Sequence, residues 1–167
     1  MPKALLERLQ PDCIGEFRAA AQQRFMDALA LAAAGRRTGS IYLCGYSAEM
    51  VLKSAYFTLA GFSDRQTVTN ADLKGAKDYA TKTLGMAWTG NFHDLAKWAE
   101  LLVTRRAVSP ALAYAMPGFG TQVVHESRSL QRIWKENLRY HKNVAYAYEL
   151  NRARAATEWL LANSLLL

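Results

Sequence analysis

The chain has 167 residues, of which 51% are hydrophobic and 21% charged, and its formal net charge is +7 at pH 7. This composition is typical of a single folded domain, 1–167, and excludes a disordered chain; two cysteines without paired spacing exclude a disulfide-rich framework and a four-cysteine zinc site. The N-terminal residues carry charges and no stretch approaches the roughly 18 uncharged apolar residues of a membrane span, so we expect a cytoplasmic protein without a membrane partner.

Hydrophobic residues recur with a helical period along most of the chain, and alternating β-branched runs are nearly absent. The expected fold class is therefore all-α: an up-and-down bundle of four to five main helices with one or two short extra helices. The expected main helices cover residues 14–34, 39–59, 91–104, 121–138 and 144–167. Short helices are expected at 71–83 and from Ser109 to about residue 116.

The expected helix 39–59 is apolar on nearly every face, which is typical of a helix at the centre of a bundle. We expect Thr38 to cap it and Cys44 to be buried in it as a small hydrophobic residue. Glu49 is followed one turn later by Lys53. Two interpretations stand: an ion pair that fixes the packed helix, which we favour, or a carboxylate whose raised pKa lets it move protons. Small residues should let neighbouring helices approach closely: Gly39, Ser40, Gly45, Ser47 and Ala48.

The next main helix is predicted to start at Asn91, as its cap, with Asp94 in the first turn, where a carboxylate suits the helix dipole. We expect His93 to be satisfied there by a local hydrogen bond; general-base chemistry is the alternative interpretation. Spacing along the last helix predicts an inward-facing stripe of Tyr148, Ala155, Trp159 and Ala162.

Four basic residues follow the expected helix 121–138 at spacings of 4, 3 and 4: Arg128, Arg132, Lys135 and Arg139. An unbroken helix would project all four from one face, where they could follow a phosphate backbone. The surrounding residues 104–167 hold nine Lys and Arg against four Asp and Glu. We take the four as candidate nucleic-acid-binding residues. A solvated helix face is the alternative, and a helix that ends before Arg139 would break the stripe.

No pattern in the sequence predicts a metal or a cofactor. His125 and His141 lie 16 residues apart, without an H-E-x-x-H spacing, and no third ligand accompanies His93 and Asp94. Walker and dinucleotide-binding fingerprints are absent as well.

Three runs, in this order, resemble the HEPN family of helical domains. Residues 37–53 read RTGSIYLCGYSAEMVLK and resemble its pattern A-x-Y-L-x-G-Y-x-x-E-x-x-L-K. Residues 93–95 read HDL, like the start of its third helix, and residues 134–140 read WKENLRY, like a W-x-x-x-L-R-Y run near its last helix. The resemblance implies a four- or five-helix bundle that is often dimeric. Members include metal-independent ribonucleases, toxins of toxin–antitoxin pairs, helical partners of minimal nucleotidyltransferases and non-catalytic binding modules.

The nuclease branch of that family places an Arg before a His, with about four to six residues between them. No Arg occupies this spacing before any of the three histidines, and Lys135, with five residues between it and His141, is the nearest approach. We therefore expect a non-catalytic HEPN-like interaction module, with no catalytic residue, that binds RNA or a protein partner through its basic C-terminal face. One alternative is a metal-independent ribonuclease or toxin with a degenerate site at Lys135, Arg139 and His141. The other is the helical partner of a minimal nucleotidyltransferase. Expected partners are RNA, an antitoxin or nucleotidyltransferase-type protein, and a second copy in a homodimer.

Overall fold

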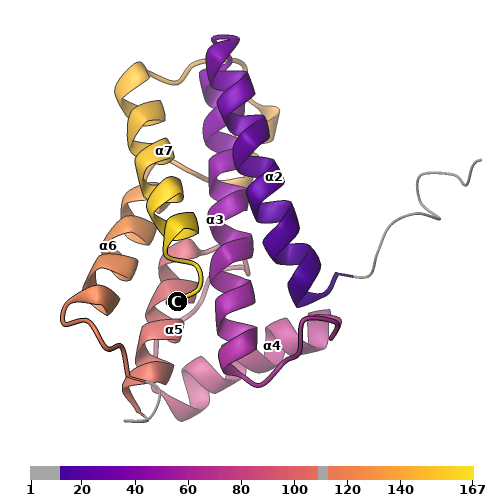
Figure 1. Ribbon diagram of the computed structural model, residues 1–167, viewed down its shortest axis with the longest axis vertical. Coiled ribbons are helices and arrows are strands. Elements are labelled where there is room, and N and C mark those ends of the chain that lie inside the picture. The colour runs from indigo at the N-terminus through magenta and orange to yellow at the C-terminus, as the bar shows by residue number, and fades with distance from the viewer. Residues whose placement is uncertain (1–11, 109–112) are drawn as a thin grey trace, which may run out of the picture.

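The computed structural model describes residues 12–108 and 113–167 (Figure 1). Within these ranges the chain forms six α-helices and no strand, and a single β-bridge joins Cys13 to Thr67. The helices are α2 (Ile14–Ala33), α3 (Arg37–Leu59), α4 (Asn70–Asp78), α5 (Leu95–Ala107), α6 (Phe119–Gln131) and α7 (Ala147–Ala162). A π-helical turn, η1 (Tyr79–Thr83), continues α4, and a 3-10 turn, η3 (Glu136–Tyr140), lies between α6 and α7.

These elements confirm the all-α class, with five main helices and short extra ones. The expected short helix from Ser109 begins outside the described residues, and residues 113–116 are not helical. None of the helices in the described part of the chain is long and apolar enough to cross a bilayer.

Helix α3 forms the centre of the bundle, as its apolar sequence predicts, and α2, α5, α6 and α7 all contact it. Two of its serines bond the neighbouring helix directly. Ser40 Oγ donates to the carbonyl of Ala28 at 2.7 Å, and Ser47 Oγ donates to the carbonyl of Ala21 at 2.7 Å. These short side chains bring α2 close to α3, as expected. Burial raises the pKa of the Cys44 thiol to about 11, so this cysteine is a packed, unreactive residue.

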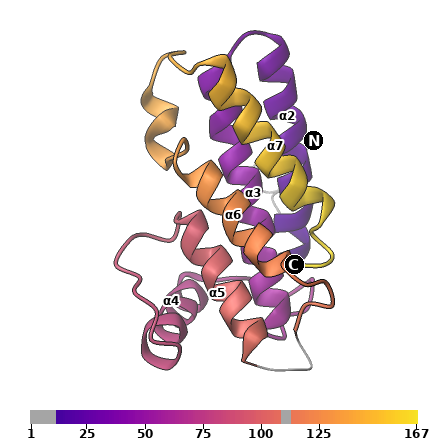
Figure 2. The same cartoon turned by 90° about the vertical axis from the view of Figure 1, so that its left-hand side faces the viewer.

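The up-and-down order of the helices holds except at one step. Glu49 of α3 contacts His93 just before α5, whereas Tyr56, two turns later on α3, bonds Arg105 within α5. Helices α3 and α5 therefore run in the same direction, and Figures 1 and 2 show α2 and α6 running the opposite way. The reason is the segment 60–94, which carries the chain back along the bundle before α5 begins.

The turn between α2 and α3 depends on Gly35, whose φ of +73° is the left-handed conformation that favours glycine. Helix α3 begins at Arg37, before the expected start, and no side chain caps it. Thr38 is therefore not the cap that we predicted. Its hydroxyl oxygen instead accepts hydrogen bonds from the backbone N–H groups of Val144 and Ala145, at 2.9 and 3.0 Å. Thr38 thus ties the segment before α7 to the start of α3.

Asp94, rather than Asn91, caps α5, because its carboxylate accepts a hydrogen bond from the Lys97 N–H at 3.0 Å. The Asn91 side chain has a different task. Its Oδ1 accepts from the His93 N–H at 3.0 Å, and its amide donates to Glu136 Oε1 at 2.7 Å. Asn91 thereby joins the segment before α5 to η3.

The predicted inward stripe of α7 is wrong. Tyr148 is 70% exposed, Ala155 and Ala162 are exposed, and Trp159 is only half-buried. The buried face consists of Leu150, Ala153, Ala156, Thr157, Leu160 and Leu161. This face meets α3, where the Thr157 hydroxyl donates to the Cys44 carbonyl at 3.2 Å. Tyr148 lies two residues before the buried Leu150, which places it on the opposite side of the helix.

Candidate functional site

The four basic residues of the predicted stripe do not lie on one helix. Arg128 is on α6 and Arg132 is its C-cap residue, whereas Lys135 has an extended backbone and Arg139 lies on η3. The prediction of one helix over 121–138 is therefore wrong, and the stripe divides into two pairs.

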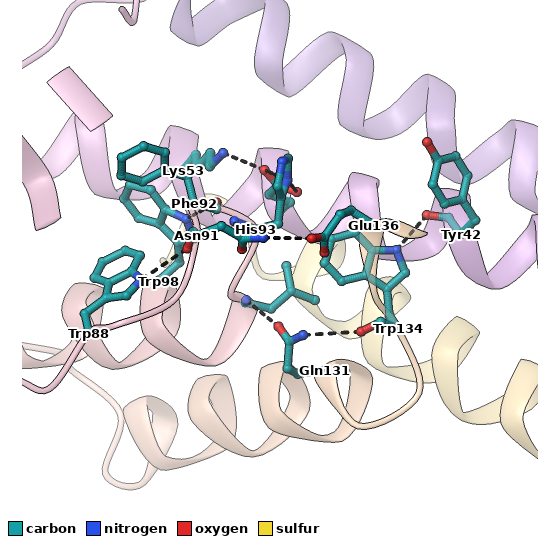
Figure 3. A network of polar contacts seen from close by, with 12 residues as sticks. Tyr42, Lys53, Trp88, Asn91, Phe92, His93, Trp98, Gln131, Trp134 and Glu136 are labelled. Atoms are coloured by element: carbon teal, nitrogen blue, oxygen red, sulfur yellow. Dashed lines mark hydrogen bonds and ion pairs between the residues drawn. The ribbon is translucent and has the colours of Figure 1, made fainter. Parts of the chain in front are cut away.

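Burial of Trp134 explains why α6 ends at Gln131 (Figure 3). The indole Nε1 donates to the carbonyl of Tyr42 at 3.0 Å, and the ring packs directly on the backbone at Gly45. The Gln131 side chain closes the helix end, because its Oε1 accepts from the Leu95 N–H at 2.6 Å and its Nε2 donates to the Trp134 carbonyl at 3.2 Å. The chain leaves the helix to insert this ring between helices.

The first pair of basic residues borders a groove along α6, which we call the α6 groove. Its volume is about 450 Å³, and its lining includes Val103, Val124, His125, Arg128 and Arg132. The last three follow one another at spacings of 3 and 4 and so share one face of the helix. No carboxylate among the described residues lines the groove.

Arg128 is partly neutralised by an acidic neighbour on α5. Its Nη2 lies 2.9 Å from Glu100 Oε1, and Lys97 Nζ lies 2.8 Å from the other oxygen of the same carboxylate. Burial opposes ionisation of Glu100, but hydrogen bonds from Lys97 and Arg128 outweigh it and hold its pKa below the ordinary value. Two cations therefore share one negative charge here.

Arg132 and Arg152 add positive charge to the same groove. Arg152 Nη2 donates to Ser129 Oγ at 2.7 Å, and Ser129 is part of the groove lining, so this guanidinium lies at the rim. Arg132 is exposed, and no carboxylate in the described part of the chain pairs with it. The groove can therefore bind an anion with Arg132 and Arg128 together.

The alternative catalytic residues Lys135, Arg139 and His141 are all exposed. Within the described residues, no hydrogen bond or ion pair joins their side chains. The Arg139 guanidinium lies 4.7 Å from the ring centre of Tyr140, and a hydrogen bond with that tyrosine raises the pKa of the guanidinium. The structure places the three residues on one connecting segment but does not assemble them into a site.

A separate polar network links α3 to the segment before α5 (Figure 3). Glu49, only 4% exposed, lies between two basic groups: Lys53 Nζ is 2.5 Å from Oε1, and His93 Nδ1 is 2.9 Å from Oε2. The ion pair with Lys53 confirms the interpretation that we favoured. The prediction of a local hydrogen bond is wrong for the His93 side chain, because the imidazole bonds Glu49, which is 44 residues away in the sequence.

An imidazole oriented by a carboxylate is suited to proton transfer. The hydrogen bond with Glu49 raises the pKa of His93 against the effect of burial. Among the described residues, no hydroxyl or thiol bonds His93, whose ring lies edge-on to Tyr46 with 6.0 Å between ring centres. The network supplies no nucleophile, and its role in the structure is to connect two segments of the bundle.

Metal-binding residues do not gather in the described part of the chain, since nowhere in it do three His, Cys, Asp or Glu side chains cluster. Cys13 and Cys44 are both free thiols. The polar side chains that line the α6 groove are the guanidinium groups of Arg128 and Arg132, the His125 imidazole and the hydroxyls of Thr121 and Ser129.

Comparisons with family models, curated proteins and solved structures find no match to this chain. The HEPN resemblance consequently stays a prediction, and a functional assignment depends on the geometry of the described residues. That geometry retains Arg128 and Arg132 as neighbours and separates them from Lys135 and Arg139. It adds Arg152, which no pattern in the sequence indicates as a binding residue.

Proposed function

We propose that this protein is an RNA-binding helical module that holds phosphate groups in the α6 groove. The observation that carries the proposal is the pairing of Arg128 and Arg132, one turn apart, along a groove of about 450 Å³ without a carboxylate in its described lining. A guanidinium group presents parallel N–H donors that match the oxygens of a phosphate. Because Arg132 has no acidic partner among the described residues, it can bind an anion without first breaking an ion pair.

RNA is the partner that this charge distribution favours. Residues 104–167 hold nine Lys and Arg against four Asp and Glu, so the positive charge extends beyond the groove. An RNA strand presents a phosphate at every nucleotide and can follow such a surface, releasing counterions as it binds. The proposed module therefore binds chiefly through phosphate contacts at the α6 groove, and sequence-specific contacts are not required there.

The test is the salt dependence of binding to a labelled single-stranded RNA, measured by fluorescence anisotropy. Replacing both Arg128 and Arg132 by Ala should weaken binding, and the slope of log K against log salt should flatten by about 1.4, since each lost contact to a single strand contributes about 0.7. The matched control replaces Arg24 and Arg65, which are exposed and outside the groove lining, and so removes the same formal charge.

Equal slopes for the wild type and the Arg128/Arg132 variant would contradict the assignment of the groove. An equal loss of affinity in the Arg24/Arg65 control would show that net charge, rather than the groove, determines binding.

Cleavage of the bound RNA is tested separately. Incubation of the protein with labelled RNA in EDTA, followed by a denaturing gel, should leave the strand intact, because no hydrogen bond orients His141 towards Lys135 or Arg139 in the described residues. Cleavage by the wild type that His141→Ala abolishes would instead assign the degenerate ribonuclease site and replace the non-catalytic module.

The oligomeric state belongs to the same proposal, because the resemblance implies a dimer. Leu165 is 94% exposed and Leu166 49% exposed, which is unusual for neighbouring large apolar residues. Sedimentation velocity of the wild type should give the mass of a homodimer. If the sedimenting species is a monomer, co-purification from a cell extract is the route to a nucleotidyltransferase-type or antitoxin partner.

A further inference from the structure

A second surface of this protein carries exposed aromatic rings beside basic side chains. We propose that Tyr140, Tyr146 and Tyr148 form a platform on which unpaired bases of single-stranded RNA stack. The inference rests on the proposed function, because it specifies the form of RNA that the module binds. We call these three residues the tyrosine platform.

The three tyrosines are exposed far more than packed aromatic residues are. Tyr140 is 75% exposed, Tyr146 65% and Tyr148 70%, and all three lie in the short segment from the last residue of η3 to the first turn of α7. The rings of Tyr146 and Tyr148 are nearly parallel, with 11° between their planes and 5.9 Å between their centres. Flat, solvent-facing rings present π faces that every base can stack on. The Arg139 guanidinium covers one face of Tyr140, 4.7 Å from the ring centre, so a base would stack on the other face of that ring.

The segment that carries the platform is fixed to the rest of the bundle. Asn143 Oδ1 accepts from the Thr38 N–H at 3.0 Å, and its amide donates to the carbonyl of Gly35 at 2.9 Å. The Tyr146 N–H donates to Glu149 Oε2 at 2.8 Å, which closes the first turn of α7. Figure 2 shows this connection meeting the end of the bundle where α2 turns into α3. The tyrosines are therefore held in place before any ligand binds, which lowers the entropic cost of binding.

Basic side chains lie on the same segment as the platform and in the turn next to it. Arg139, His141 and Lys142 belong to the same segment and are exposed, and Arg36 and Arg37 are exposed in the adjacent turn that Asn143 bonds. The two carboxylates of the segment are engaged: Glu149 accepts from the Tyr146 N–H, and Glu136 accepts from the Asn91 amide. Arg36, Arg37, Arg139 and Lys142 outnumber these two carboxylates, so the platform combines stacking rings with a net positive charge, as proteins that bind single strands do.

A small, mostly apolar cavity lies beside Tyr146. Its volume is about 180 Å³, and its lining consists of Ile41, Ile133, Leu138, Val144 and Ala145 together with the polar residues Thr38, Tyr146 and Glu149. Apolar cavities of about 150 Å³ in other proteins accept a benzene ring. This cavity therefore has room for one aromatic ring, which a base splayed out of the strand can supply.

A base-stacking platform distinguishes single strands from duplexes. Bases inside a duplex are already stacked on one another, and protein side chains reach only their edges. The α6 groove, by contrast, contacts phosphates, which both forms of RNA present. The tyrosine platform is the feature of this molecule that assigns single-stranded RNA as the ligand.

The experiment measures anisotropy with a labelled oligouridylate strand, the same strand annealed to its complement, and inorganic polyphosphate as an unlabelled competitor. Replacing Tyr140, Tyr146 or Tyr148 by Leu should weaken binding of the single strand by about tenfold for each ring. The matched Tyr→Phe variants, which keep the ring, should bind like the wild type. The inhibition constant of polyphosphate, which has no bases, should be the same for the wild type and for either kind of variant. Circular dichroism checks that each variant is folded.

The possible failures are distinguishable. If the Leu variants bind the single strand as tightly as the wild type while the Arg128/Arg132 variant binds it weakly, the platform is overturned and the proposed function stands. If the duplex binds as tightly as the single strand, the platform is likewise overturned. If the wild type binds neither form, the proposed function and the platform both fail.

Discussion

Gly45 lies directly against the ring of Trp134, a residue from a distant part of the sequence. A Cβ atom added at Gly45 would overlap the indole ring of Trp134, whose Nε1 is already committed to the Tyr42 carbonyl. Neither the α3 backbone nor the fully buried ring has room to move. Position 45 therefore requires glycine because of packing and not because of backbone conformation.

Gly45→Ala should destabilise the protein by about 2 kcal/mol in chemical denaturation, because overpacking outweighs the better helix propensity of alanine. Gly75→Ala is the matched control: Gly75 also lies in a helix, but a Cβ there meets nothing within 4 Å. The control should be neutral or stabilising by up to about 1 kcal/mol. If Gly45→Ala unfolds at the same denaturant concentration as the wild type, the tight contact between Gly45 and the Trp134 ring is contradicted.

His93 makes stability depend on pH. Its folded-state pKa is raised by the hydrogen bond with Glu49, so the folded protein holds this proton more tightly than the unfolded chain does. The contribution is fully present below about pH 6.5, the ordinary pKa of histidine, and is lost as pH rises through the higher folded value. His93→Gln should therefore lower the free energy of unfolding by about 1 kcal/mol near pH 5.5 and by less near pH 9. The value near pH 5.5 is small because solvent screens the charge of the partly exposed ring. Thermal unfolding of both proteins across this range measures the difference, and a difference that grows with pH would contradict it.

At the scale of elements, one threonine hydroxyl holds the connection between η3 and α7 in place. Thr38 is 3% exposed, and its Oγ1 accepts the N–H groups of both Val144 and Ala145. This buried acceptor fixes the start of α7 relative to α3, and with it the neighbouring tyrosines.

Thr38→Val should destabilise the protein by about 1–3 kcal/mol, because it leaves two backbone donors without their partner while preserving the shape of the side chain. Hydrogen exchange at Val144 and Ala145 should accelerate together. Thr38→Ser, which keeps the hydroxyl, is the control and should retain slow exchange. Protected amides in Thr38→Val would show that the hydroxyl is not what holds this segment.

For the whole molecule, the central position of α3 predicts cooperative unfolding. Trp98 packs against Tyr56 and Phe57 of α3, and Trp134 packs against Tyr46 on the same helix, with ring centres 5.5, 6.0 and 5.6 Å apart. Both tryptophans therefore lose their environment when α3 unfolds. Tryptophan fluorescence and far-ultraviolet circular dichroism should report the same thermal midpoint. Two separate midpoints would show that the chain unfolds in parts and is not a single domain.

The amino-acid sequence by itself determined the fold class, most helices and the central place of α3. These features depend on hydrophobic periodicity and on small residues within one segment, so the information is local. The Glu49–Lys53 ion pair could be predicted for the same reason, since residues four apart on a helix are neighbours.

Only the tertiary structure decided where α6 ends, what His93 bonds and which face of α7 is buried. The partners in these contacts lie far apart in the chain: Trp134 needs the space above Gly45, and His93 needs the carboxylate of Glu49. A helical pattern that continues past Arg132 contains no information about either partner. These contacts also decided which basic residues share a site. Because the buried indole ring of Trp134 ends α6, Arg128 and Arg132 remain on the α6 groove, whereas Arg139 lies beside the exposed Tyr140.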